Sequence, residues 1–119
     1  MITIYHNPRC SKSRAARELV ETVHPSSNEP VQVVEYLKQP PSVEQLAELH
    51  RILGCPIQQM LRVDEKEYRE LGLDRADITD DEIYDAITRH PVLLQRPIVV
   101  RDGRAVIGRP PERVMALFE

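Results

Sequence analysis

The order of apolar patterns in the first third of the chain restricts the fold more than any other feature. Residues 2–5 are mostly apolar and residues 31–36 are rich in β-branched side chains, so each run predicts a strand. Between them, apolar side chains recur at helical spacing over residues 15–23, and the turn-rich residues 24–28 end that helix. This order predicts a βαβ unit with two parallel strands and a right-handed crossover.

Helix signals fill the middle of the chain. Two capping boxes begin helices, namely Ser42 with Gln45 and Thr79 with Glu82. Shorter helical segments are expected at residues 57–61 and 64–71. We therefore predict an insertion of several short helices at approximately residues 42–90, in a place where connections are usually only a few residues long. An insertion of this size beside a reactive loop suggests an element that covers substrate.

The last part of the chain predicts a hairpin and a helix. Strands are expected at residues 98–100 and 105–107, joined by the tight turn Asp102-Gly103, and the prolines after residue 109 begin the final helix. The complete order is βαβ, helical insertion, ββα. This is the order of the thioredoxin-like fold, an α/β fold with a four-stranded mixed β-sheet, and we expect residues 1–119 to form a single domain of this kind.

Composition and charge exclude several classes of protein. The 119 residues carry a formal net charge of −3 without a domain-wide basic excess, which argues against a nucleic-acid binder. No run is long enough to span a bilayer and no signal peptide precedes the first strand, so we expect a cytoplasmic protein with no membrane partner. Two cysteines are too few for a disulfide framework, and four scattered histidines give no metal-ligand spacing. With no nucleotide-binding motif either, we expect no metal and no bound cofactor.

One cysteine stands in the loop between the first strand and the first helix. Cys10 lies among polar and charged residues rather than on an apolar stripe. Residues 1–17 contain four basic side chains and no acidic one, so the local field is positive. A helix N-terminus offers free backbone N–H groups, which stabilise a thiolate and an oxyanion alike. We therefore interpret the loop as a reactive thiolate in an anion-binding site.

These polar residues also have simpler structural interpretations. A lone cysteine is usually a small buried hydrophobic residue, and Cys-x-x-Ser alone is a weak signal. Arg9 and Lys12 could be merely solvated surface charges. Cys55, beside Gly54 and Pro56 at a helix junction, is interpreted as a structural, buried cysteine, with an internal resolving thiol as the alternative.

Three arginines stand at the ends of predicted elements, where sites are assembled. Arg62 follows a helix, Arg96 precedes a strand and Arg109 follows a strand. A guanidinium offers a rigid fork of donors that matches a tetrahedral oxyanion. Each arginine alone would usually be a surface charge. We expect the strands beside Arg96 and Arg109 to lie next to the first strand, which favours a shared site for these two.

Four segments together resemble the ArsC family of thioredoxin-fold, glutaredoxin-dependent arsenate reductases, and most of all its YfgD-type branch. They are residues 5–14 (YHNPRCSKSR), 61–62 (LR), 95–100 (QRPIVV) and 108–112 (GRPPE), in the family's order and spacing across essentially the whole chain. The combination is specific, although no single motif would be. The resemblance implies a cis peptide bond before Pro97, which would face the reactive cysteine.

The resemblance also implies roles for individual residues. Cys10 would attack arsenate, or a related oxyanion, and form a covalent thiol–arsenate adduct. Arg62, Arg96 and Arg109 would bind the oxyanion, and Ser13 would donate a hydrogen bond to the thiolate. The residues implied to support the loop are His6, Ser13, Lys12 and Pro97.

The reductants follow from the loop and from the resemblance. Position 13 holds serine rather than a second cysteine, so an external thiol must regenerate Cys10. The resemblance identifies this thiol as glutathione, a co-substrate, and the partner that resolves the mixed disulfide as glutaredoxin. The charges of Arg9 and Lys12 depart from the better-characterised branch; they alter the pocket but still favour anion binding.

Two other functions stay open at this point. A general glutathione-dependent thiol–disulfide oxidoreductase would use the same thiolate, with the arginines holding glutathione carboxylates. An Spx-like regulator that binds RNA polymerase shares the fold and the insertion, but such regulators often carry Cys-x-x-Cys, which this chain lacks at Ser13. The arsenate reductase is the leading hypothesis, because the whole set of motifs resembles that family.

Overall fold

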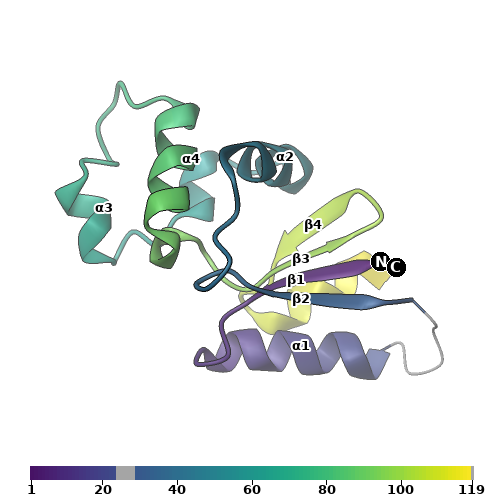
Figure 1. The fold of residues 1–119 in the computed structure, drawn as a ribbon. Coiled ribbons are helices and arrows are strands. Elements are labelled where there is room, and N and C mark those ends of the chain that lie inside the picture. The colour runs from purple at the N-terminus through teal and green to yellow at the C-terminus, as the bar shows by residue number, and fades with distance from the viewer. Residues whose placement is uncertain (24–28, 119) are drawn as a thin grey trace. The chain divides into compact units, whose positions relative to one another are not determined.

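The chain forms two compact units. The structure is a computed structural model, and it describes residues 1–23 and 29–118. One unit is Met1–Tyr36 with Arg96–Glu119, and the other is Leu37–Gln95. The first contains a β-sheet with helices, and the second consists of short helices and loops (Figure 1).

The helical insertion expected at approximately residues 42–90 falls within the second unit, Leu37–Gln95. The turn expected at residues 24–28 lies outside the described residues.

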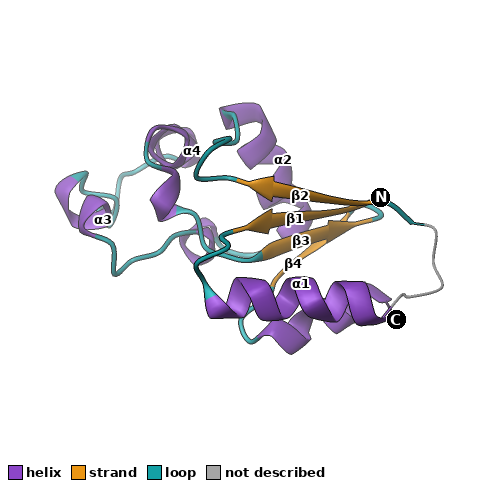
Figure 2. Cartoon of the chain, turned by 60° about the horizontal axis from the view of Figure 1, so that its bottom comes forward, coloured by secondary structure: helices purple, strands orange, loops and turns teal. Residues whose placement is uncertain are grey.

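The sheet of the first unit has four strands, β1 (Ile2–His6), β2 (Val31–Glu35), β3 (Ile98–Arg101) and β4 (Arg104–Ile107). Their order is β2-β1-β3-β4 (Figure 2). Strand β1 pairs with β2 in parallel and with β3 antiparallel, and β3 pairs with β4 antiparallel. The predicted mixed sheet of a thioredoxin-like fold is therefore confirmed. The expectation that the strand before Arg109 lies beside the first strand is wrong, because the tight hairpin turn makes β3 the neighbour of β4.

An α-helix and a 3₁₀ helix cover the same face of this sheet (Figures 1 and 2). They are α1 (Ser11–Val23) and η3 (Pro111–Phe118). Alternate residues of β1 point toward them, because side chains of a strand alternate between its two faces. The buried core on this face consists of Ile2, Ile4, Val99, Ala16, Val20, Val114 and Leu117. Burial of such apolar surface stabilises a fold by ~25 cal/mol per Å².

Helix α1 begins four residues earlier than its apolar pattern predicts. The N–H of Arg14 donates to the C=O of Cys10 over 3.0 Å, which closes the first turn of the helix. Three of the four side chains at residues 11–14 are exposed, so this turn carries no apolar signal. The consequence is that Cys10 directly precedes the helix.

The second unit contains α2 (Val43–Leu53), η1 (Ile57–Met60), α3 (Lys66–Glu70), α4 (Asp80–Arg89) and η2 (Pro91–Leu93). Both predicted capping boxes are confirmed. The Ser42 hydroxyl accepts the N–H of Gln45, and the Thr79 hydroxyl accepts the N–H of Glu82. Helices α2 and α4 therefore begin where the sequence predicts them.

The helix expected at residues 64–71 is shorter than predicted. The chain first makes a turn, closed by the N–H of Glu65 donating to the C=O of Arg62 over 3.2 Å. Helix α3 begins only after this turn and is five residues long. The turn brings the side chains of residues 62 and 65 to the same side, because they are three positions apart in the chain.

Gly108, which precedes Arg109, permits close packing of the first unit. A Cβ atom at this position would lie 3.0 Å from Cγ of Pro97, 3.2 Å from Cγ1 of Val114 and 3.4 Å from Cβ of Ala16. We expect Gly108→Ala to lower the free energy of unfolding by about 1–3 kcal/mol, because a well-packed core resists added volume. Urea unfolding followed by circular dichroism measures this change. An unchanged unfolding midpoint would show that the packing can relax at no cost.

Candidate active site

Cys10 lies at the junction of β1 and α1. Strand β1 ends at His6 and α1 begins at Ser11, so residues 7–10 carry the chain from the sheet to the helix. Because the C=O of Cys10 accepts the N–H of Arg14, Cys10 is the N-cap residue. Its side chain is half-buried and its thiol is free. The sulfur is thus reachable at a helix end where backbone N–H groups lack helical partners.

Asn7 fixes the shape of the loop through three hydrogen bonds. Its C=O accepts the N–H of Cys10 over 3.0 Å, and its Oδ1 accepts the N–H of Arg9 over 3.0 Å. Its own N–H donates to Oγ of Ser13 over 3.0 Å. Asn7 is not among the predicted site residues, although asparagine before proline is typical of such turns.

His6 and Ser13, two of the predicted supporting residues, contact each other beneath the loop. They are buried, with 3% and 0% of their surfaces exposed, and Nδ1 of His6 lies 2.8 Å from Oγ of Ser13. Burial, and then the charge of Arg17, hold the pKa of His6 below its ordinary value, so the ring is neutral at pH 7. The Ser13 hydroxyl accepts the N–H of Asn7 and is hydrogen-bonded to Nδ1 of His6.

Hydrogen-bond donors and one positive charge stabilise the thiolate of Cys10. Burial raises the pKa of the Cys10 thiol. The backbone N–H groups of Ser13 and Lys12, with the charge and a hydrogen bond of Arg96, lower this pKa by more, so it ends below its ordinary value. Ser13 donates to the thiolate through its backbone, since its hydroxyl is engaged elsewhere. Lys12 also acts through its backbone, and its side chain is exposed.

Arg96 and Arg109 belong to the same unit as Cys10 and contact each other. Nη1 of Arg109 donates to the C=O of Arg96 over 3.2 Å. The contact forms because pairing of β3 with β4 brings the start of one strand beside the end of the other. The peptide bond between Arg96 and Pro97 is cis, as predicted, and so is that between Arg109 and Pro110. The hairpin therefore brings together two of the three predicted oxyanion-binding arginines, and Arg96 is hydrogen-bonded to Cys10.

Arg62 belongs to the second unit, where carboxylates engage it. Its Nη1 donates to Oε1 of Glu65, and its Nη2 lies 3.8 Å from Oδ2 of Asp64. Its backbone N–H donates to the C=O of Leu93 over 2.8 Å. The oxyanion-binding role of Arg62 stays a prediction.

The second cysteine has a different electrostatic setting. Cys55 is half-buried, whereas the sequence predicted a buried cysteine. Burial raises the pKa of its thiol, and a hydrogen bond from its own backbone N–H offsets this only in part. Its C=O accepts Nε2–H of His50 over 3.0 Å, and Nδ1 of His50 lies 2.6 Å from the hydroxyl of Tyr84. These contacts favour the structural role predicted for Cys55.

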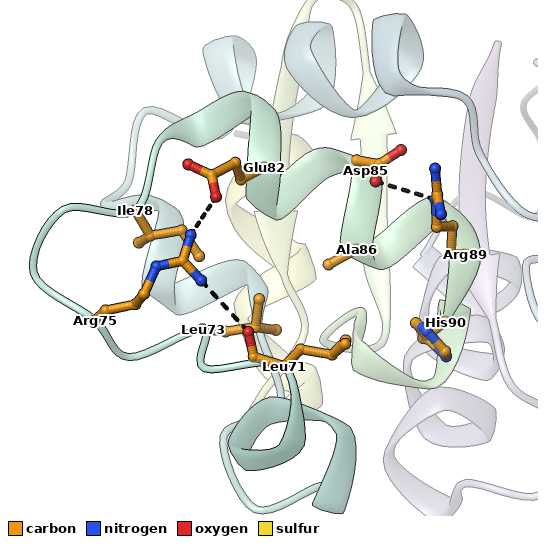
Figure 3. Close-up of a pocket in the computed structure, with 9 residues that line it drawn as sticks. All are labelled: Leu71, Leu73, Arg75, Ile78, Glu82, Asp85, Ala86, Arg89 and His90. Carbon is orange, nitrogen blue, oxygen red and sulfur yellow. Dashed lines mark hydrogen bonds and ion pairs between the residues drawn. The ribbon is translucent and has the colours of Figure 1, made fainter.

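A separate hollow lies within the second unit (Figure 3). Its apolar lining residues are Leu71, Leu73, Ile78 and Ala86, and its polar ones are Arg75, Glu82, Asp85, Arg89 and His90. Arg75 is paired with Glu82, and Nε of Arg89 lies 3.1 Å from Oδ2 of Asp85. None of the predicted site residues lines this hollow, and we assign it no catalytic role.

Within residues 1–23 and 29–118, no group of three or more His, Cys, Asp or Glu side chains is arranged to hold a metal ion. No helix of these same residues combines the length and the apolar character needed to cross a membrane.

Known proteins resemble the chain over nearly its whole length. The model of the ArsC family matches residues 5–117. A protein named arsenate reductase from Neisseria meningitidis serogroup A is 44% identical over 118 residues, which cover 98% of this chain and 97% of that protein. Escherichia coli K12 YfgD, named as uncharacterized, is 40% identical over 98% of this chain and 95% of its own length. A solved arsenate reductase from Vibrio cholerae gives a TM-score of 0.90 at 43% identity, covering 98% of this chain and 96% of that one.

The pKa values of the two cysteine thiols should lie on opposite sides of the free-thiol value of about 8.5. We expect Cys10, measured in a Cys55→Ser variant, to ionise below that value, and Cys55, measured in a Cys10→Ser variant, to ionise above it. Adding Arg96→Gln to the Cys55→Ser variant should raise the pKa of Cys10, because a nearby positive charge is lost. Ultraviolet thiolate absorbance across pH measures all three. Equal titration of the two thiols would contradict this account of the loop.

Proposed function

The chain belongs to the ArsC family, as its motifs indicated, and on that premise we propose that it is an arsenate reductase with the Cys10 thiolate as its nucleophile. The observation that carries this proposal is the half-buried Cys10 thiol, whose pKa is lowered by donors that outweigh the effect of burial. A thiol that attacks arsenic must be ionised near neutral pH and open to an anionic substrate. Cys10 combines both properties.

In the proposed first step, the sulfur of Cys10 attacks the arsenic atom of arsenate. An S–As bond forms, and one arsenate oxygen takes up protons and leaves as water. Arsenic keeps its oxidation state in this covalent adduct. Backbone N–H groups at the start of α1 and the arginine donors stabilise the charge on the remaining oxygens, since donors that are already oriented need no reorganisation during the reaction.

In the proposed second step, glutathione supplies the electrons. Its thiolate attacks the sulfur of Cys10, the S–As bond breaks, and its electron pair goes to arsenic, which leaves as arsenite. Two sulfurs each lose one electron, arsenic gains two, and a mixed disulfide of Cys10 with glutathione is left. A glutaredoxin thiol then attacks the glutathione sulfur and releases the Cys10 thiolate. No metal or bound cofactor enters these steps, and the reductants fit a cytoplasmic location.

Three arginines are the proposed ligands of the oxyanion. The fork of a guanidinium fits two oxygens of a tetrahedral anion. Arg96 and Arg109 are supported by their contact at the open end of the β3–β4 hairpin, where β3 begins and β4 ends. Arg96 is also hydrogen-bonded to Cys10. For Arg62, support comes from the family motif. The proposed supporting residues are His6, Ser13, Lys12 and Pro97.

Cys10→Ser should abolish arsenate reduction, because a serine hydroxyl is not ionised near neutral pH and forms no disulfide. The measurement is arsenate-dependent oxidation of NADPH in an assay coupled through glutathione, glutaredoxin and glutathione reductase. Cys55→Ser is the matched control and should keep the wild-type rate. Turnover by Cys10→Ser at the wild-type rate, or no turnover by the wild-type protein, would overturn the proposal.

Arg96→Ala should weaken arsenate binding by about 1.5–3 kcal/mol, the contribution of a hydrogen bond to a charged group. Calorimetric titration is best done in the Cys10→Ser background, so that the effect of Arg96 on the thiolate does not enter the result. Arg51→Ala is a suitable control, since Arg51 forms an exposed ion pair with Glu48 on α2. If both variants bind arsenate equally well, Arg96 is not part of the site.

A further inference from the structure

Arg62 is already bound to an anion of its own chain. Its Nη1 donates to the carboxylate of Glu65, and the two side chains are only 18% and 24% exposed. The ion pair of Arg51 with Glu48 is far more open, at 70% and 58%. Exposed pairs are weakened by water and salt, whereas a shielded pair keeps much of its electrostatic attraction. The Arg62–Glu65 pair is therefore a shielded local contact that any other anion at Arg62 has to replace. Burial, and then the charges of Asp64 and Glu67, raise the pKa of the Glu65 carboxyl, so this carboxylate is not held as firmly as burial of the pair alone would suggest.

The backbone around this pair is held in place independently of the two side chains. The N–H of Arg62 donates to the C=O of Leu93, and the N–H of Glu65 donates to the C=O of Arg62. Next to them, Leu61 and Leu94 form an antiparallel bridge. Because backbone bonds close the turn, exchanging the partner of the guanidinium requires only movement of side chains.

The position of Glu65 suggests that its carboxylate caps helix α3, but the carboxylate does not have this role. Glu65 is the N-cap residue of α3, where an acidic side chain often accepts a backbone N–H. Its side chain makes no such capping bond and turns to Arg62 instead. The neighbouring Asp64 is 77% exposed and lies 3.8 Å from Nη2, so it contributes much less.

We propose that Glu65 competes with a substrate oxyanion for Arg62 and thereby sets which anions this guanidinium binds. The inference rests on the proposed function, because it takes Arg62 as an oxyanion ligand. A doubly charged tetrahedral oxyanion, such as arsenate or phosphate, displaces the carboxylate because it carries more charge and fits the guanidinium fork. A singly charged spherical anion, such as chloride, lacks both advantages and leaves the pair intact.

The test is Glu65→Gln, which keeps the size of the side chain and removes its charge. Phosphate is the probe, because it has the shape and charge of arsenate and is not reduced. We expect phosphate to bind about tenfold more tightly in calorimetric titration, and chloride to compete at lower concentration than in the wild-type protein. Glu70→Gln is the control, since it removes an exposed carboxylate from the end of α3, and it should change affinity by less than about twofold.

A second variant shows whether Glu65 acts through Arg62. In an Arg62→Gln background, Glu65→Gln should produce no further change in phosphate affinity, because the group it competes for is absent. If Glu65 only stabilises the turn, Glu65→Gln will lower the thermal unfolding temperature and leave phosphate affinity equal to or weaker than that of the wild-type protein. That result would overturn the inference.

Phosphate binding does not require turnover, so the two proposals fail separately. If Glu65→Gln tightens phosphate binding but the wild-type protein reduces no arsenate, the competition at Arg62 is upheld and the reaction is wrong. If the wild-type protein reduces arsenate and Glu65→Gln binds phosphate as the wild type does, the reaction is upheld and the competition is wrong.

Discussion

The hydroxyl of Ser13 ties the first turn of α1 to the end of β1, and the geometry around Cys10 depends on it. The hydroxyl accepts the N–H of Asn7 and is bonded to His6, the last residue of the strand. Because the turn cannot drift from the strand, the backbone N–H groups of Ser13 and Lys12 stay directed at the sulfur. Donors oriented in advance stabilise a developing charge at no cost of reorganisation, so one buried hydroxyl contributes to the reactivity of a thiol it does not touch.

The hydrogen bonds of this hydroxyl also explain why a second cysteine would fit poorly at position 13. Sulfur is a weak hydrogen-bond donor and a weak acceptor, so cysteine at position 13 would hold Asn7 and His6 poorly. A buried polar group left without its partner costs about 1–3 kcal/mol. The residue at position 13 can thus anchor the loop or resolve a disulfide, but not do both well. A loop anchored by Ser13 favours an external reductant, in agreement with the proposed role of glutathione.

Features that depend on short-range patterns were predictable, and features that depend on chain geometry were not. A short, mostly apolar run predicted β1, and two capping boxes predicted the starts of α2 and α4, because each signal lies within a few neighbouring residues. The start of α1 at Ser11 was missed, since its first turn is recognised by hydrogen bonds and not by apolar spacing. Asn7 was missed for the same reason. The sequence could not show that Arg62 pairs with Glu65, because several carboxylates follow Arg62 in the chain. The turn determines which of them the guanidinium contacts.

The net charge of the chain does not indicate how its individual groups interact with anions. The whole chain carries −3, yet residues 1–17 hold four basic side chains and no acidic one. Salt screens charges over about 8 Å under physiological conditions, so the Cys10 thiolate responds to its near neighbours and not to the total charge. The backbone N–H groups of Ser13 and Lys12 and the charge of Arg96 are the neighbours that lower its pKa. Arg62 shows the opposite local balance, since Glu65 already matches its charge. On the proposed roles, the first arrangement attracts anions in general, whereas the second yields only to a strongly charged one.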